Sequence, residues 1–279
     1  MRSAKAYAKI NLGLVVGSLR DDGKHEVVTL LQRLDIHDDV ALEPADALTV
    51  EGFAEDTIVR SALESLAVAA GVEPRWHARI EKRIPVAAGL GGGSSDAAAA
   101  LQLANAELSD PLDPNALHAI AAAVGADVPF FLRQGAQVAT GDGTELTGVD
   151  LPIDYHVVLV VPQSEKKQST AAVYEAFDVR RGAAGFEQRA EAFHRALESI
   201  SDSPDLARLP VNDLAASPIT RELDAAGAFR SDVSGAGPVV YGLFEREEAA
   251  AGAAAELTRV GRTLVTRPVG AVDLPRVAR

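Results

Sequence analysis

The chain carries a glycine-rich run from Pro85 to Leu101, PVAAGLGGGSSDAAAAL, which passes directly into alanines. Residues 89–95, here called the glycine loop, hold four glycines and two serines, and strong helix formers follow them. Glycine lets the backbone adopt positive φ and approach a ligand closely. The first turn of a helix presents unpaired N–H groups and a partial positive charge. A glycine loop that enters a helix therefore predicts a site for an anion, above all a phosphate group.

Two common phosphate-binding loops do not fit this run. A Walker A motif ends in Gly-Lys-Ser/Thr, but no lysine occurs between Arg83 and Arg133. The dinucleotide fingerprint needs glycine at its sixth position, and counting from Gly89 puts Ser94 there. A flexible helix entry without a ligand is the alternative, although such a dense glycine cluster is destabilising unless a ligand needs close access. The hydroxyls of Ser94 and Ser95 can reach a phosphate or a phosphate-bound Mg²⁺.

Composition limits the class of protein. The 279 residues are 47% hydrophobic and 24% charged, which predicts one large globular domain or two modest ones. The absence of cysteine excludes disulfides, thiolate zinc sites and cysteine nucleophiles. No apolar run reaches the roughly 18 residues of a membrane span, and no signal peptide is recognisable, so we expect a cytoplasmic protein without a membrane partner. The net charge of −13 disfavours nucleic acid as a partner and requires local groups to attract any anionic ligand.

Strand-like and helix-like patterns alternate along the chain without strict β-α-β regularity. A hairpin turn is predicted at Asp22-Gly23, a helix after the glycine loop, and a further helix over Asn212–Gly227. The composition changes near Leu151, where a buried strand begins a new region. These features predict an α+β fold in two lobes, divided into residues 1–152 and 153–279.

Four runs together resemble one kinase superfamily, which contains galactokinase, homoserine kinase, mevalonate kinase and phosphomevalonate kinase. The glycine-rich run is similar to its second motif, in the form found in the 4-diphosphocytidyl-2-C-methyl-D-erythritol kinase branch. That branch's first motif resembles AKINLGLVVGSLRDDGKHEV from Ala8, its catalytic-aspartate motif resembles GADVPFFL from Gly125, and the superfamily's third motif resembles VSGAGPVVYGLF from Val233. The four runs occur in the expected order and span nearly the whole chain.

The resemblance implies a two-lobed small-molecule kinase fold, with a ribosomal S5 domain 2-like N-terminal lobe for nucleotide and catalysis. A ferredoxin-like C-terminal lobe would complete the substrate site. The implied reaction uses ATP and Mg²⁺ to phosphorylate the 2-hydroxyl of 4-diphosphocytidyl-2-C-methyl-D-erythritol, a step of the non-mevalonate isoprenoid route. The partner is then a small molecule with a cytidine diphosphate group, and the chain a monomer or weak homodimer. A kinase for homoserine or mevalonate, or a non-catalytic nucleotide sensor, is the alternative.

Phosphoryl transfer needs a nucleotide cradle, charge neutralisation and an oriented hydroxyl. The ATP-binding residues implied by the resemblance are Pro85, Gly89, Leu90, Gly91, Gly92, Gly93, Ser94 and Ser95. Asp127 is the predicted catalytic base, although its place before Val128-Pro129 equally suits a helix cap. Lys9 lies in an apolar strand, where it either faces the surface or needs a partner. The resemblance implies that Lys9 pairs with Asp127 near the acceptor hydroxyl.

The acceptor site is expected around the first motif. Asn11 lies on the same strand face as Lys9 and is expected to bond the erythritol part. The family usually has Gly-Tyr-His where this chain has Gly23, Lys24 and His25. There the tyrosine stacks on cytosine and the histidine bonds its edge; the Lys24 stem can cover a base, or its ammonium can meet a phosphate. Further implied substrate-binding residues are Thr170, Tyr174, Gly235 and Gly237. The other five histidines lack metal spacing, and no protein ligand to a metal is predicted.

Overall fold

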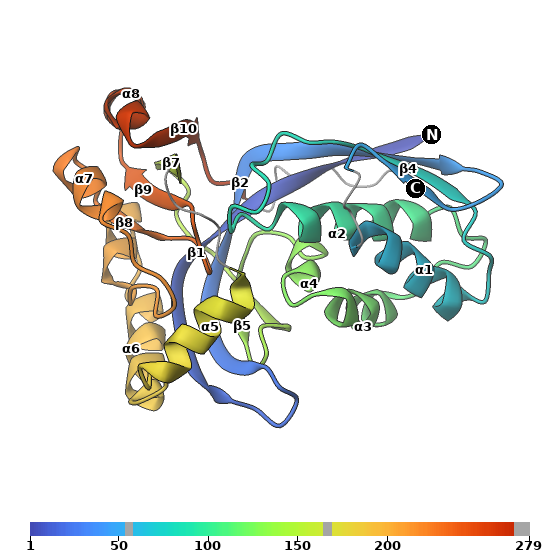
Figure 1. Cartoon of the computed structure of the whole chain (residues 1–279), viewed down its shortest axis with the longest axis horizontal. Coiled ribbons are helices and arrows are strands. Elements are labelled where there is room, and N and C mark those ends of the chain that lie inside the picture. The colour runs from blue at the N-terminus through green and yellow to red at the C-terminus, as the bar shows by residue number, and fades with distance from the viewer. Residues whose placement is uncertain (54–57, 164–168, 271–279) are drawn as a thin grey trace.

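The computed structural model describes residues 1–53, 58–163 and 169–270, which build two sheets with helices packed on them (Figure 1). The first sheet contains β1 (Arg2–Leu19), β2 (His25–Pro44), β3 (Thr49–Glu51), β4 (Trp76–Glu81), β5 (Ala136–Thr140) and β6 (Glu145–Val149). The second sheet contains β7 (His156–Pro162), β8 (Arg230–Val233), β9 (Val240–Phe244) and β10 (Gly261–Thr266).

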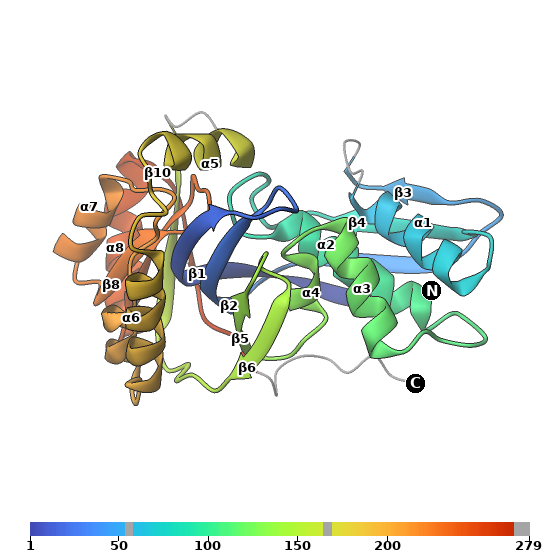
Figure 2. The same cartoon turned by 90° about the horizontal axis from the view of Figure 1, so that it is seen from below.

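Helices α1 to α4 all lie on one face of the first sheet, and Figure 2 shows the same arrangement from below. The α-helices are α1 (Ile58–Ala70), α2 (Gly92–Asn105), α3 (Pro114–Val124), α4 (Val128–Phe131), α5 (Thr170–Val179), α6 (Phe186–Glu198), α7 (Ile219–Ala225) and α8 (Glu247–Glu256). The described part of the chain also contains the 3₁₀ helices η1 (Ser203–Arg208) and η2 (Leu257–Arg259). None of the helices in the described ranges combines the length and apolarity needed to cross a bilayer.

Strands β1 and β2 form a long antiparallel hairpin, and β2 also pairs with β4 and β5 in the first sheet. The strand order is β3-β4-β2-β5-β6, and β1 pairs with β2 along almost its whole length. The hairpin turn contains Gly23 with φ of 79°, at the Asp-Gly position where the sequence predicts a turn. Register shifts at Tyr7/Ala8 and at Asn11/Gly13 bracket Lys9 and Asn11. Such bulges change the direction of neighbouring side chains, here those that enter the site.

The second sheet is antiparallel throughout, in the order β10-β7-β9-β8. Numbered within this lobe, the order is 4-1-3-2, which is the arrangement of ferredoxin-like folds. The expectation of an α+β fold with a ferredoxin-like second lobe is confirmed.

Helix α2 explains the alanines that follow the glycine loop. Residues from Ser95 to Leu101 are all buried, because α2 is packed between the first sheet and helices α1 and α4. A helix with neighbours on several sides needs small side chains that let the backbones approach. Alanine supplies both this close packing and the strongest helix propensity.

The two lobes share one hydrophobic cluster. It joins Ile10 and Leu12 of β1 to Val157 of β7, Phe193 of α6 and Tyr241 of β9. The Tyr241 hydroxyl also donates a hydrogen bond of 3.0 Å to the Asn11 carbonyl. The chain passes from the first sheet to the second between β6 and β7; the division near residue 152 stays a prediction, because the core is continuous across it.

The helix predicted over Asn212–Gly227 is wrong in its first half, since α7 begins only at Ile219. The Asn212 amide instead donates to the carbonyls of Val233 and Gly235, at 2.9 and 2.6 Å. These tertiary bonds hold the segment before α7 in a non-helical path beside the third motif. Side-chain bonds to distant backbone compete with the helix in this way.

Candidate active site

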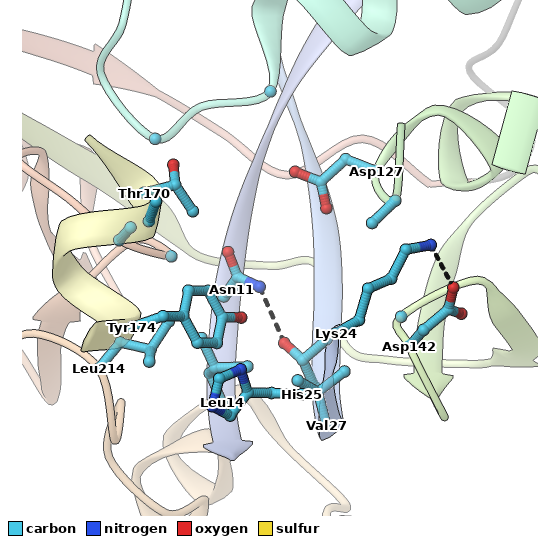
Figure 3. Close-up of a pocket in the computed structure, with 18 of the residues that line it drawn as sticks. Asn11, Leu14, Lys24, His25, Val27, Asp127, Asp142, Thr170, Tyr174 and Leu214 are labelled. Carbon is cyan, nitrogen blue, oxygen red and sulfur yellow. Dashed lines mark hydrogen bonds and ion pairs between the residues drawn. The ribbon is translucent and has the colours of Figure 1, made fainter. Parts of the chain in front are cut away.

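A pocket of about 770 Å³ lies where the glycine loop, the β1–β2 hairpin, α5 and the third motif meet (Figure 3). The sequence-predicted residues that line it are Lys9, Asn11, Lys24, His25, Gly89, Gly91, Ser94, Asp127, Thr170, Tyr174, Gly235 and Gly237. Among the other predicted residues, Leu90 and Ser95 are buried in the fold. Pro85, Leu90, Gly92, Gly93 and Ser95 do not line this pocket, so their contact with a nucleotide stays a prediction.

The glycine loop can take its path only because two positions lack a side chain. Gly89 has φ of +82°, and a Cβ there would lie 2.5 Å from the Ser234 carbonyl oxygen. Gly91 has φ of +71°, and its Cβ would lie 2.9 Å from the Phe131 ring. The loop is also bonded to its neighbours, since the Lys9 N–H donates to the Leu90 carbonyl at 2.9 Å. Close approach and positive φ therefore both require glycine here.

The N-terminus of α2 faces the pocket. The helix begins at Gly92, and Ser94 in its first turn lines the pocket, whereas Ser95 is 2% exposed. The first-turn N–H groups and the positive end of the helix dipole favour an anion at this place. The Ser94 hydroxyl adds a donor, so this wall suits phosphate oxygens.

Lys9 and Asp127 form an ion pair at the centre of the site, with 3.2 Å between Nζ and Oδ2. The Lys9 side chain is 4% exposed, while the Asp127 side chain is 39% exposed. Lys9 also donates to Asn11 Oδ1 at 2.7 Å, and Asn11 in turn donates to the Thr29 hydroxyl at 2.8 Å. The buried ammonium thus has two oxygen partners, as a buried charge requires.

The Asp127 side chain does not cap helix α4, which was the alternative role for this residue. Asp127 stands at the N-cap of α4, yet its carboxylate makes no capping hydrogen bond. The carboxylate faces Lys9 and the pocket instead. A half-exposed carboxylate beside a buried ammonium is well placed to accept a proton from a bound hydroxyl.

Arg33 holds the segment that carries Asp127, and sequence reasoning missed it. It pairs with Lys9 in the β1–β2 register and is 2% exposed. Its guanidinium donates to the Phe130 carbonyl at 2.8 Å and to the Gly135 carbonyl at 3.3 Å, and lies 4.5 Å from the Phe130 ring centre. Burial lowers the pKa of Arg33 to about 10, which leaves it charged at neutral pH. An arginine among the leucines of the strand-like run LLQRLDI was the available signal.

The other end of the pocket is aromatic. The His25 ring lies 4.7 Å from the Tyr174 ring at an interplanar angle of 31°, and His25 Nε2 is 2.9 Å from Asp178 Oδ1. Burial, and then the charge of Asp127, raise the pKa of Tyr174 to about 12. Pocket-lining residues that the sequence reasoning missed include Leu14, Val27, Asp142, Asp178 and Leu214. Asp178 lies four residues after Tyr174, so the helix period could have revealed it.

A buried charge cluster anchors both ends of the glycine loop. Lys82 Nζ lies 2.5 Å from Asp38 Oδ2 and 2.7 Å from Asp96 Oδ2, and both carboxylates are fully buried. Asp38 Oδ1 also accepts the N–H groups of Arg83 and Ile84, which lead into the loop. Asp96 lies in α2, directly after the loop. Burial raises the pKa of Asp96 to about 7, against the opposing effect of Lys82.

Comparison with known proteins identifies the class first. The family models of the GHMP kinases match this chain in both lobes: the N terminal domain over residues 57–135 and the C terminal domain over residues 183–263. A crystal structure of mevalonate kinase covers 97% of the chain with a TM-score of 0.74 at 13% identity, which shows a common fold.

Closer relatives identify the branch. 4-Diphosphocytidyl-2-C-methyl-D-erythritol kinase of Nocardia farcinica is 40% identical over 278 residues, 92% of this chain and 89% of the relative. The enzyme of that name from Chlorobium luteolum is 37% identical over 261 residues, 87% of this chain and 88% of the relative. A crystal structure of 4-(cytidine 5'-diphospho)-2C-methyl-D-erythritol kinase matches 96% of this chain and all of that one, with a TM-score of 0.76 and 30% identity. The chain therefore belongs to the 4-diphosphocytidyl-2-C-methyl-D-erythritol kinase family of GHMP kinases, and the resemblance of the four motifs is confirmed.

We expect Gly89→Ala to lower the free energy of unfolding by about 2 kcal/mol or more, because positive φ alone costs roughly 1–2 kcal/mol in a residue with a Cβ. The clash with the Ser234 carbonyl adds to this. Gly93→Ala is the matched control, since its Cβ would meet nothing closer than 3.5 Å and alanine favours a helix by about 0.5–1 kcal/mol. Urea unfolding measures both; a Gly89→Ala variant as stable as Gly93→Ala would contradict the strained path.

The pKa of Asp96 makes its contribution to stability dependent on pH. Its folded pKa of about 7 lies above the usual value near 3.9, so the folded state binds the proton more tightly. The contribution of Asp96 to the free energy of unfolding is therefore fully present below about pH 4 and is lost as the pH rises to about 7. It falls by at most about 1.4 kcal/mol per pH unit.

Asp96→Asn removes this titration. The difference in unfolding free energy between wild type and variant should therefore favour the wild type more at pH 5 than at pH 8. Urea unfolding at both values measures it, with the exposed Asp110→Asn as a control of equal charge change. The same difference at both pH values would refute the raised pKa.

Proposed function

We propose that the chain transfers the γ-phosphoryl group of ATP to the 2-hydroxyl of 4-diphosphocytidyl-2-C-methyl-D-erythritol, a step of the non-mevalonate route to isoprenoid precursors. The names of the relatives support this acceptor. The observation that carries the proposal is the Lys9–Asp127 ion pair, which lies in one pocket with the glycine loop. This arrangement provides the cradle, the cation and the base that phosphoryl transfer to an alcohol needs.

The glycine loop would hold the polyphosphate of ATP. Its N–H groups and the Ser94 hydroxyl are donors, and hydrogen bonds to charged groups contribute about 1.5–3 kcal/mol each. The dipole of α2 adds roughly 0.3–1 kcal/mol, and up to about 2 kcal/mol where the site is partly buried. Several such contacts together bind an anion in spite of the chain's net charge of −13.

Asp127 would accept the proton of the acceptor hydroxyl as the oxygen attacks the γ-phosphorus. The new oxygen–phosphorus bond forms while the bond from the γ-phosphorus to the bridging oxygen of ADP breaks. Lys9, 3.2 Å from Asp127, holds the carboxylate in place and offsets charge on the transferred group. Asn11, bonded to Lys9, orients the hydroxyl.

Mg²⁺ would enter with the nucleotide. Mg²⁺ keeps several waters and usually takes one or two carboxylates together with substrate phosphates. Across residues 1–53, 58–163 and 169–270, no group of three or more His, Cys, Asp or Glu side chains could hold a metal ion. The Ser94 hydroxyl lines the pocket and fits the smaller role of adding a ligand to a phosphate-bound ion. The ion neutralises phosphate charge when bound.

The cytidine diphosphate group would occupy the aromatic end. Tyr174 offers a ring face for the base and His25 a hydrogen-bonding edge, both in the same pocket as Asn11. Thr170 at the start of α5, with Gly235 and Gly237 of the third motif, would contact the rest of the acceptor. A cytoplasmic location and a monomeric or weakly dimeric state remain predictions from the sequence.

Turnover tests the proposal. We expect the wild type to phosphorylate the cytidyl acceptor much faster than homoserine or mevalonate, and Asp127→Asn to lower kcat by about 10²–10⁴-fold. The affinity for an ATP analogue should stay within about twofold, because the variant keeps the glycine loop. Coupled ADP release measures the rate and calorimetry the affinity, with Asp110→Asn as the control.

Each outcome separates the alternatives. Fast turnover of homoserine or mevalonate with an inert cytidyl compound would identify another acceptor. ATP binding without turnover of any alcohol would favour the nucleotide sensor. Full activity of Asp127→Asn would remove Asp127 from its role as the base.

A further inference from the structure

The turn between β5 and β6 brings a carboxylate, Asp142, to the pocket. Gly141 and Gly143 on either side both have positive φ, 67° and 95°. The Gly141 carbonyl accepts the Val27 N–H at 2.8 Å, which fixes the turn against β2. Asp142 Oδ1 accepts from the Thr144 N–H at 3.1 Å and from its hydroxyl at 2.6 Å. Bonds within the turn therefore hold the Asp142 carboxylate in place without help from distant residues.

Lys24, from the β1–β2 turn, bonds to this carboxylate with 2.5 Å between Nζ and Oδ2 (Figure 3). Its backbone is fixed as well, since its N–H donates to Asp22 at 3.0 Å and its carbonyl accepts the Arg20 N–H at 2.7 Å. Burial pushes the pKa of Asp142 upward, but hydrogen bonds from Lys24 and Thr144 lower it to about 2. The carboxylate is thus ionised at neutral pH, and both ends of the lysine side chain are held.

The aliphatic stem of Lys24 and the aromatic rings of Tyr174 and His25 lie at opposite sides of the pocket. Figure 3 shows Lys24 and Asp142 on one side of Asn11, and Tyr174 with His25 on the other. Apolar side chains complete this end of the pocket: Leu14, Val27 and Leu214. The Lys24 stem and the aromatic rings line one pocket and together offer apolar surface that suits a flat heteroaromatic group.

We propose that Asp142 determines the affinity for the base-bearing end of the acceptor, by holding Lys24 so that its stem and Tyr174 enclose a planar base. The inference rests on the proposed function, whose acceptor carries cytosine. Asp142 acts through Lys24 and is a positioning residue. The Lys24 ammonium is already paired with a carboxylate, so the lysine contributes packing area to the base more than charge to the diphosphate.

Asp142→Asn tests this role. It keeps the shape of the turn but releases the lysine, which the acceptor must then order, so KM for the cytidyl acceptor should rise about 3- to 10-fold. Lys24→Met should raise KM by a similar factor, because its stem also loses the anchor. The double variant should be no worse than either single variant, since both remove the same interaction. In Asp142→Asn, kcat and the KM for ATP should stay within twofold of the wild type. If Asp142 had only a structural role, these two values would change together with the KM for the acceptor.

Glu145→Gln is the matched control, because Glu145 directly follows the turn at the start of β6. Its carboxylate accepts from the Thr140 hydroxyl at 3.3 Å, outside the pocket lining. The inference is overturned if Asp142→Asn lowers the KM for the acceptor. That result is expected if the Lys24 ammonium binds a phosphate and Asp142 holds it back from doing so. Additive effects in the double variant, or an equal rise in KM for ATP, would also overturn it.

A separate measurement keeps this test distinct from that of the function. If the wild type fails to phosphorylate the cytidyl acceptor, the proposed function is wrong, and calorimetry with cytidine diphosphate still tests Asp142. Weaker binding of cytidine diphosphate to Asp142→Asn, with unchanged binding of an ATP analogue, supports the inference. Equal affinity of wild type and variant for cytidine diphosphate rejects it.

Discussion

The contact between the glycine loop and the third motif is the constraint on which the site depends. Gly89 lies so close to the Ser234 carbonyl that no Cβ fits, and the Ser234 hydroxyl donates back to the Gly89 carbonyl at 2.9 Å. The same loop is bonded through Leu90 to the backbone of Lys9. One segment thus joins the second lobe to the strand that carries Lys9. The pocket exists because the loop reaches both neighbours without side chains in the way.

Buried charged residues surround this loop, and the free energy needed to remove them from water suggests that they serve the activity. Lys9, Arg33 and Lys82 are each largely removed from water, which is unfavourable unless every charge finds oxygen partners. Lys9 bonds Asn11 and faces Asp127, while Arg33 bonds the backbone carbonyls of Phe130 in α4 and of Gly135. Replacement of a whole buried ion pair by well-packed apolar residues is often neutral or stabilising, so such pairs are not needed for stability alone. Their presence is explained if the charges position a phosphoryl group and its acceptor.

Local sequence patterns predicted the local features and missed most long-range contacts; the Lys9–Asp127 pair was expected only from the family resemblance. The glycine loop, the turn at Gly23 and the common strand face of Lys9 and Asn11 follow from backbone preferences and the period of a strand. The Lys24–Asp142 pair joins residues 118 positions apart, and no local pattern signals it. The same holds for Lys82 with Asp38, which are brought together by strand pairing. The segment after Asn212 was misjudged because its helical pattern gives way to tertiary hydrogen bonds.

The most direct measurement is a crystal structure with a non-hydrolysable ATP analogue and the cytidyl acceptor bound together. The account predicts phosphate oxygens on the N–H groups of residues 89–95 and the terminal phosphate beside Lys9. The acceptor 2-hydroxyl should lie about 2.6–3.2 Å from the Asp127 carboxylate. A nucleotide bound away from the glycine loop, or an acceptor hydroxyl directed away from Asp127, would contradict the account.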